Sequence, residues 1–363
     1  MFKFFPPLII LLNVLYGVPR FSIIEGTSCN LCHINPSGGS LRNDYGIIIT
    51  SEDITYEKTN KILNNDDIGE ISNHIRIGAD LRLQSVKDKN KNVLFPMQLD
   101  LYSFLNYKNL VGLYIESETL IDNTEYWTIA YLPILEGYVK AGRSKPYFGL
   151  NIDDHTAFIR GGNINPKYGM VREGSIFSPY KNPVNIIEFG FNLSNIFITS
   201  SISNSFINNN SSNISFLGLP NQRTYNFRAE IYSEFLNTNM LYGISYLEEQ
   251  NINFKSIFGG FFLNKISFMS EIDLIENWVD FNQGMASFSE IAFMYKPGLN
   301  LLFQYNFYDE NLKLQTNSIQ RYSIGIEFFL FNFWEFKFQT RYNRFNDLKF
   351  EPIEFIGQLH FWF

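Results

Sequence analysis

The sequence predicts an all-β protein, an antiparallel transmembrane β-barrel of about sixteen strands that follows a short N-terminal segment. Aromatic residues make up 17% of the chain, with 37 Phe and 21 Tyr, and this mix favours strands over helices. From Ile71 onward, apolar and polar residues alternate in repeated runs, which Asn, Asp, Gly, Pro or Lys residues separate. The final strand is aromatic and ends at Phe363, which is typical of outer-membrane barrels of Gram-negative bacteria.

The composition excludes several classes of protein. Of the 363 residues, 45% are apolar and 18% are charged, so the chain does not resemble a disordered protein. No apolar run reaches the length of a membrane-spanning helix. The net charge is −7 and Lys and Arg form no cluster, so we expect no nucleic-acid partner. The 2 cysteines are too few for a disulfide framework.

Residues 1–22 are predicted to be a signal peptide. A short charged start at Lys3 precedes a mostly apolar stretch over residues 8–15, which is too short to span a bilayer. Gly17 and Ser22 are small residues near a plausible cleavage point. A buried N-terminal strand is the alternative interpretation. Export would place the rest of the chain in an oxidising compartment outside the cytoplasm.

Both cysteines belong to one motif, Cys29-Asn30-Leu31-Cys32-His33. This C-x-x-C-H spacing is that of c-type haem attachment, in which two thiols add to the haem vinyl groups and the histidine becomes the proximal iron ligand. A thioredoxin-type redox pair would need a βαβ setting, which the sequence lacks. A structural zinc site would need a second pair of Cys or His ligands. We therefore expect one covalent haem c.

The expected cytochrome segment covers residues 23–70. Arg42 follows a turn that Pro36, Gly38 and Gly39 mark, and its guanidinium could pair with a haem propionate. A solvated Arg42 on a small loop is an equally good interpretation. The segment is near the lower size limit for a self-supporting core. We therefore expect another part of the chain to cover the haem.

Residues 71–363 are predicted to form the barrel. In the first strand, Ile75, Ile77 and Leu81 share one face and polar residues share the other. Short connections, expected at the periplasmic end, alternate with longer polar connections, expected at the extracellular end, and sixteen strands would leave a polar, open lumen. The expected strands cover residues 71–85, 93–106, 110–118, 125–132, 137–145, 184–192, 196–204, 224–235, 240–248, 253–263, 266–275, 285–295, 299–309, 320–330, 335–345 and 351–363.

One connection, residues 146–183, is far longer than the others. It contains several glycines and aromatic residues together with a polar cluster that includes Asp153, Asp154, His155 and Arg160. Long loops of this kind are usually functional or disordered. We expect it to fold into the lumen, as the third loop does in many porins, and a mobile surface loop is the alternative.

The order of these features resembles the fused monohaem cytochrome–porin proteins, whose best-known members are outer-membrane iron(II) oxidases. The resemblance covers architecture over the whole chain, and its specific motif is limited to Cys29, Cys32 and His33. It implies a bacterial outer-membrane location, with the haem segment in the lumen or on the periplasmic side. It also implies an extracellular electron donor, for which Fe(II) is a candidate, and periplasmic electron carriers as acceptors.

Three functions are therefore considered. The leading one is an outer-membrane electron-transfer protein, with iron(II) oxidation as its candidate enzymatic activity. The second is a diffusion porin whose haem-bearing segment is structural or regulatory, and the third is a soluble periplasmic β-protein. Acidic residues expected at the extracellular strand ends could attract cations or simply line the rim. They are Glu116, Glu118, Asp309 and Glu310.

Candidates for the second axial ligand of the haem are few. His155 lies on the long loop next to Asp154, which could orient its imidazole. By alternation, His74 and His360 face the lumen at the periplasmic ends of the first and last strands, which become neighbours when the barrel closes. Met170 is a softer alternative on the long loop. We expect His155 first and His74 second, with ordinary lumen lining as the alternative for His74 and His360.

Overall fold

The structure, a computed structural model, describes most of the chain after residue 18. The described residues are 19–39, 41–49, 54–56, 68–89, 92–119, 123–152, 154–160, 162, 164–165, 170–171, 183–205, 223–277, 282–314, 318–346 and 352–363. Most of the expected signal peptide and Asp153 therefore lie outside the described residues. Among the described helices, none has the length and apolarity needed to cross a membrane.

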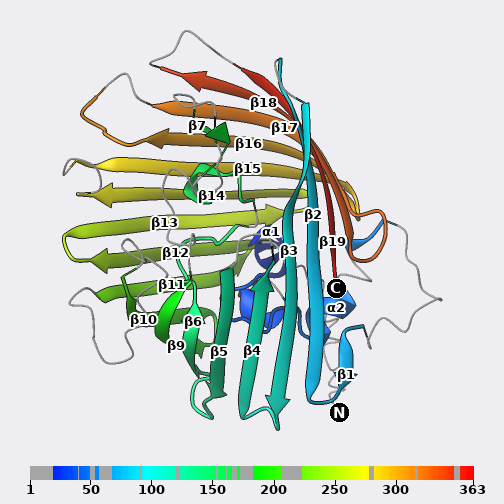
Figure 1. Ribbon diagram of the computed structural model, residues 1–363, viewed down its shortest axis with the longest axis vertical. Coiled ribbons are helices and arrows are strands. Elements are labelled where there is room, and N and C mark those ends of the chain that lie inside the picture. The colour runs from blue at the N-terminus through cyan, green and yellow to red at the C-terminus, as the bar shows by residue number, and fades with distance from the viewer. Residues whose placement is uncertain are drawn as a thin grey trace, which may run out of the picture.

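Sixteen antiparallel strands, β2–β6 and β9–β19, form a closed barrel, which confirms the predicted fold class (Figure 1). Closure comes from the pairing of β19 with β2, in register from Phe355 opposite Lys87 to Trp362 opposite Asp80. The bounds are α1 (Pro19–Glu25), η1 (Cys29–Leu31), α2 (Asp44–Ile49), β1 (Glu70–Ser72), β2 (Ile75–Lys87), β3 (Asn92–Tyr107), β4 (Val111–Glu118), β5 (Asn123–Tyr131), β6 (Tyr138–Ser144), η4 (Phe158–Arg160), β7 (Ile164–Asn165), β8 (Met170–Val171), β9 (Val184–Leu193), β10 (Ile196–Asn204), β11 (Arg223–Phe235), β12 (Thr238–Glu249), β13 (Ile252–Leu263), β14 (Ile266–Glu276), β15 (Gly284–Lys296), β16 (Leu299–Asp309), β17 (Ile319–Phe328), β18 (Trp334–Phe345) and β19 (Ile353–Trp362).

Alternation along each strand separates an apolar exterior from a polar interior. Ile257, Ile324 and Phe338 are 70%, 65% and 60% exposed on the outer face, whereas Arg228 and Glu271 on the inner face are each 1% exposed. Similar exposed aliphatic and aromatic side chains occur on strands all around the wall. A continuous apolar exterior of this kind suits a lipid environment rather than water. The two ends of the barrel differ, and we call them the short-turn end and the long-loop end.

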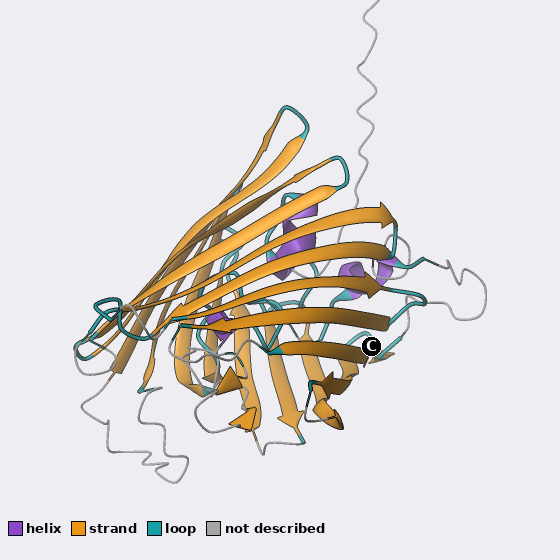
Figure 2. Ribbon diagram, turned by 90° about the horizontal axis from the view of Figure 1, so that it is seen from above, coloured by secondary structure: helices purple, strands orange, loops and turns teal. Residues whose placement is uncertain are grey.

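The N-terminal segment lies inside the barrel, where the helices are surrounded by strands (Figure 2). Helix α1 packs against β12, β13 and β14. Two wall glycines face this segment: a Cβ at Gly260 would lie 2.6 Å from Cδ1 of Ile23, and one at Gly78 would lie 2.6 Å from Cδ1 of Leu41. A Cβ would also lie 2.2 Å from the carbonyl oxygen of Phe268 at Gly260 and 2.5 Å from that of Phe363 at Gly78, so a larger residue would disturb the wall backbone as well as the segment. Both glycines let the segment approach the wall closely.

Helix α1 is also held by charge. Nη1 of Arg20 lies 2.7 Å from Oε1 of Glu290 on β15, and its Nη2 contacts Glu327 on β17. Arg20 is 2% exposed, so this is a buried ion pair between the segment and the wall. Residues 19–22, which the sequence assigned to the signal peptide, belong to α1 in the structure.

The start of the long loop also occupies the lumen. The backbone N–H of Leu150 donates to Glu271, 2.7 Å away, and Nε of Arg228 donates to the carbonyl oxygen of Gly149, 2.8 Å away. Farther along, Nη1 of Arg321 donates to the carbonyl oxygen of Thr156 at 2.7 Å. The prediction of an open lumen is therefore wrong, because the N-terminal segment and this loop fill much of the polar interior.

Candidate functional site

The C-x-x-C-H residues form a single tight turn. The backbone N–H groups of Cys32 and His33 both donate to the carbonyl oxygen of Cys29, each at 3.2 Å. Gly38 has a φ of +81° and packs against this turn, where a Cβ would lie 3.1 Å from Cβ of Cys29. A glycine suits this position because it adopts the left-handed conformation without strain and leaves room for the cysteine. The sequence thus gathers both thiols and one imidazole on one short turn.

The environment of the cysteines does not suit thiol redox chemistry. Cys32 is 3% exposed, and burial raises its pKa to about 12. Burial also raises the pKa of Cys29, which lies beside Ser22 and Tyr147. Reactive thiols have lowered pKa values and accessible sulfur atoms. The described residues also contain no cluster of three or more Cys, His, Asp or Glu side chains arranged to hold a metal ion.

One cavity lies on the lumen side of the turn, and we call it the lumen cavity. Cys29 and His33 line it together with His155 from the long loop. Its other walls supply aromatic and aliphatic surface, several cations and the carboxylates of Asp80, Asp100, Glu116, Glu118, Glu125 and Glu335. The apolar residues and the cations include Phe21, Tyr102, Pro146, Ile152, Phe329 and Trp362, with Arg42, Arg82, Lys145 and Arg160.

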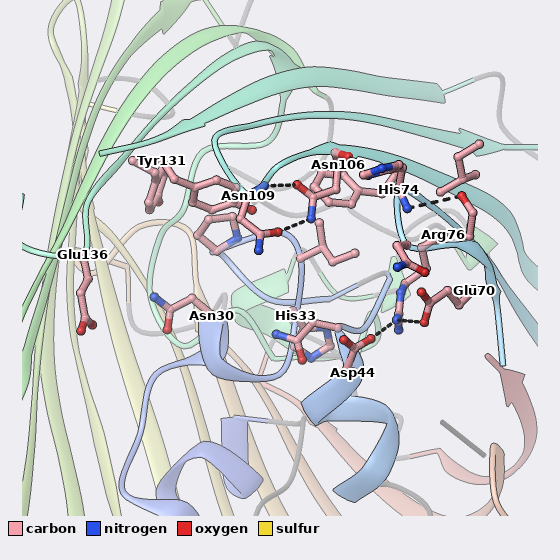
Figure 3. A pocket seen from close by; sticks show the side chains of 18 residues that line it. Asn30, His33, Asp44, Glu70, His74, Arg76, Asn106, Asn109, Tyr131 and Glu136 are labelled. Carbon is pink, nitrogen blue, oxygen red and sulfur yellow. Dashed lines mark hydrogen bonds and ion pairs between the residues drawn. The ribbon is translucent and has the colours of Figure 1, made fainter. Parts of the chain in front are cut away.

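A second cavity, the short-turn pocket, opens at the short-turn end (Figure 3). His33 and His74 line it, with Asn30, Asn106 and Asn109 close by. Its described charges are mostly paired: Arg76 contacts Asp44 and lies 3.6 Å from Glu70. The lining is thus richer in amides than that of the lumen cavity, whereas the lumen cavity has more carboxylates.

His33 is 4% exposed and lines both cavities. The cavity volume is about 380 Å³ in the short-turn pocket and about 140 Å³ in the lumen cavity. Size alone therefore favours the short-turn pocket for a porphyrin. Chemistry favours the lumen cavity, because a covalent haem must contact Cys29, and Cys29 and the cation Arg42 line only this cavity. Side chains around a cavity can move apart, but the attachment point of a covalent group cannot.

The long loop brings His155 to the lumen cavity, where it shares the lining with His33. Its neighbour Asp154 accepts hydrogen bonds from the backbone N–H and hydroxyl of Thr156 and lies 3.4 Å from Nζ of Lys337. Burial disfavours the charged carboxylate, but Lys337, Arg341 and the Thr156 hydrogen bonds outweigh this and lower the pKa of Asp154 below its ordinary value. The loop is thus anchored close to His155.

The predicted proximity of His74 and His360 is wrong. His360 pairs with Arg82 across the closing seam, whereas His74 lies in the turn before β2 begins at Ile75. Eight residues of extended strand separate the two positions, roughly 26 Å. His74 is exposed, and its Nδ1 lies 3.1 Å from the carbonyl oxygen of Asn106.

His360 faces the lumen as alternation predicted, but both of its ring nitrogens are engaged. Nε2 lies 3.0 Å from Asp80 and Nδ1 lies 2.9 Å from Glu335. His360 is therefore unavailable as an iron ligand in this arrangement. The side chain of Met170, the fourth candidate, lies outside the described residues.

Arg42 lies beside the proximal histidine. His33 and Arg42 form an isolated antiparallel β-bridge, and the guanidinium carbon of Arg42 lies 4.9 Å from the ring centroid of Trp362. Of the acidic residues expected at the extracellular strand ends, Glu116 and Glu118 lie at the long-loop end of β4 and line the lumen cavity.

Sequence reasoning missed several residues that hold the N-terminal segment in place. Nδ2 of Asn151 on the long loop donates to the carbonyl oxygen of Ser37, 2.7 Å away, and Nζ of Lys140 lies 3.4 Å from Oδ1 of Asn35. Tyr147, 0% exposed, lies beside Cys29. Alternation in β6 places Lys140 on the lumen face, but nothing local in the sequence names its partner.

No family model and no curated protein matches the sequence. Solved structures do match. OprB of Pseudomonas putida at high pH aligns with a TM-score of 0.58 and 9% identity, covering 80% of this chain and 94% of that chain. The outer membrane channel DcaP of Acinetobacter baumannii aligns at 0.52 with 12% identity, over 80% and 97% of the two chains. Salmonella typhi OmpF, in complex with daunomycin, gives 0.53 and 9% over the same shares. At these identities the likeness shows the fold: this chain has a porin-like barrel.

Proposed function

We propose that the chain is a bacterial outer-membrane electron-transfer protein, a monohaem cytochrome–porin whose barrel holds one covalent haem c in the lumen cavity. The observation that carries the proposal is the position of His33, which lines one cavity toward the lumen and another at the short-turn end. A redox group at this position lies within reach of partners from both ends of the barrel. The apolar exterior and the porin-like fold support the membrane location.

The residues around the turn suit this function. The group that we propose supplies a one-electron couple. Cys29 and Cys32 provide the thiols for attachment, and His33 provides the proximal imidazole. His155 is the proposed distal ligand, because it shares the lumen cavity with Cys29, whereas His74 does not. Phe21 and Tyr102 supply apolar surface beside these residues, and burial of the group is one means of setting a redox potential.

In this proposal, the donor approaches from the long-loop end, which we place at the cell surface. The periplasmic acceptor approaches the short-turn pocket. Fe(II) is the candidate donor, because carboxylates such as Glu116, Glu118 and Glu125 line the lumen cavity and favour a cation. Oxidation of Fe(II) would then be the enzymatic activity.

A diffusion porin with a structural haem is the second candidate. The porin-like fold and the loop inside the lumen favour it. The N-terminal segment opposes it, because Arg20, Ile23 and Leu41 are buried against the wall in the space through which solutes would pass.

The test begins with the purified membrane fraction. We expect a haem stain that survives denaturation and a reduced-minus-oxidised spectrum that responds to added Fe(II). The protein is then placed in liposomes that contain an oxidised dye, and an external donor is added. The C29A/C32A double variant is the matched control, and its barrel folding is checked by heat-dependent electrophoretic mobility.

Electron transfer to the enclosed dye that requires Cys29 and Cys32 would support the conduit. Leakage of enclosed solutes without electron transfer would support the diffusion porin instead. A colourless protein, after maturation in cells that attach haem c to another protein, would refute both haem proposals.

A further inference from the structure

We infer that Trp362 and Arg42 form a carboxylate-binding site on the closing strand of the barrel, and that a haem propionate occupies it. The inference rests on the proposed function and extends it to a residue of the barrel wall. Both residues line the lumen cavity with Cys29 and His33. The site joins the N-terminal segment to the last strand, β19.

The backbone fixes where Arg42 points. His33 and Arg42 are partners in an antiparallel β-bridge, and the neighbouring hydrogen bond from the N–H of Ile34 to the carbonyl oxygen of Leu41 supports the pairing at 3.1 Å. Side chains that are directly opposite in such a bridge project from the same face, with Cβ atoms about 5 Å apart. Arg42 therefore extends on the side of the proximal imidazole. A guanidinium in that position can reach the edge of a group that His33 ligates.

Trp362 supplies an unused donor. Trp362 is 4% exposed and lies on the lumen face of β19. The guanidinium carbon of Arg42 lies over its ring, 4.9 Å from the ring centroid. Among the described residues, the indole Nε1–H has no hydrogen-bond acceptor. A buried indole N–H usually has a hydrogen-bond partner, and an unsatisfied one is unfavourable. An acceptor on a bound ligand would satisfy the Nε1–H of Trp362.

The nearest protein carboxylates have other partners. Nε2 of His360 lies 3.0 Å from Oδ2 of Asp80, and Nδ1 of the same ring lies 2.9 Å from Oε2 of Glu335. The rings of His360 and Trp362 lie with centroids 4.5 Å apart, so these two acids are near the site but are directed to the imidazole.

The chemistry of the site defines its ligand. A planar guanidinium beside an indole N–H matches the two oxygens of a carboxylate, because each donor can address one oxygen. A haem propionate has this chemistry, and so does a free carboxylate such as acetate. We assign the propionate, because covalent attachment through Cys29 would place it in the same cavity at high effective concentration.

The experiment uses redox-difference infrared spectroscopy on the purified holoprotein. Haem is labelled with ¹³C at the propionate carboxyl carbons, and the carboxylate bands that carry the label are recorded. The variants W362F and R42Q remove one donor each. W334F is the matched control, because Trp334 on β18 packs against Phe361 instead of the lumen cavity.

We expect the labelled carboxylate band to shift in W362F and in R42Q and to stay unchanged in W334F, with the covalent haem retained in all three. R42Q alters only the N-terminal segment, so it keeps the test valid if W362F does not fold. An unchanged labelled band in W362F and R42Q would overturn the inference while the haem proposal stands.

A further arm distinguishes the two sources of carboxylate. Unlabelled haem protein is exchanged into ¹³C-acetate, and the same bands are recorded. A band that follows the acetate label would refute the propionate assignment. Absence of covalent haem from the wild-type protein would instead refute the proposed function.

Discussion

The two sides of His33 differ in chemistry more than in size. Toward the lumen, the imidazole lies with Cys29, His155, aromatic rings and a mixture of cations and carboxylates. Toward the short-turn end, it lies with His74, several asparagines and carboxylates that are largely paired with Arg76. The larger space lies on the short-turn side. The difference teaches that the position of Cys29, not the cavity volume, assigns the proposed haem to the lumen side.

The largest expected effect comes from removing the attachment point. The C29A/C32A variant should lose all covalent haem, because no other cysteine exists in the chain. The barrel should still fold, since neither thiol makes a contact on which closure of β19 with β2 depends. Haem staining after denaturing electrophoresis measures the loss, and retained staining would refute the attachment site.

The next prediction compares the two sides directly. H155A should change the haem absorption spectrum, because the proposed distal ligand is lost, whereas H74A should leave the spectrum unchanged. The reverse result would move the cofactor to the short-turn pocket. Unchanged spectra in both variants would exclude both candidates and leave Met170 as the next residue to test.

A third prediction concerns the helix that forms one wall of the lumen cavity. R20M should lower the free energy of unfolding by about 3–5 kcal/mol, because it leaves Glu290 and Glu327 buried without their cation. K255M is the matched control. The Lys255–Glu276 pair is surface-exposed at 47% and 29%, so its loss should cost at most about 1 kcal/mol.

Thermal or denaturant unfolding in detergent measures both variants. Equal stability of R20M and wild type would mean that Arg20 is absent from the mature protein, as cleavage after residue 22 would require. Mass spectrometry of the mature N-terminus decides this point. We expect the mature chain to retain Pro19 and Arg20, because α1 needs both.

The smallest expected effect concerns the loop that closes the lumen cavity. Because the pKa of Asp154 is lowered in the folded protein from its ordinary value of 3.8, its contribution is complete above that value and is lost as the pH falls further. Loop anchoring should therefore weaken only in acid. D154N should remove this acid dependence and increase hydrogen exchange at the N–H of Thr156, with no change at the short-turn pocket. A wild-type pH profile in D154N would refute the role of Asp154.

The barrel was predictable because the alternation of apolar and polar residues in each strand indicates which face meets lipid and which face meets the lumen. Lipid outside and polar contacts inside impose alternation on the sequence, and the sixteen expected strands agree with the observed ones within a few residues. The first expected strand is the exception, since a turn at Asn73 and His74 divides β1 from β2. That turn removed His74 from the lumen.

The filling of the lumen was less predictable. Cys29, Cys32 and His33 could be proposed from the sequence because their spacing is local and specific, and their role as a haem site stays a prediction. The partners of Arg20 were not, because Glu290 lies 270 residues away and nothing in α1 identifies it. The same holds for Trp362, which in the sequence is one more aromatic residue at the end of a strand. Contacts of this kind join the N-terminal segment to distant strands, and these residues come together only when the barrel has closed.

Gly78 and Gly260 have a consequence for inheritance and engineering. Each leaves out a single methyl group where Leu41 or Ile23 enters the wall. A porin with alanine at the positions of Gly78 and Gly260 would leave no space for Leu41 and Ile23 of the N-terminal segment. The barrel and the N-terminal segment must therefore be transferred together. In a chimera that combines the segment with the barrel of another porin, the segment should fail to pack in the lumen.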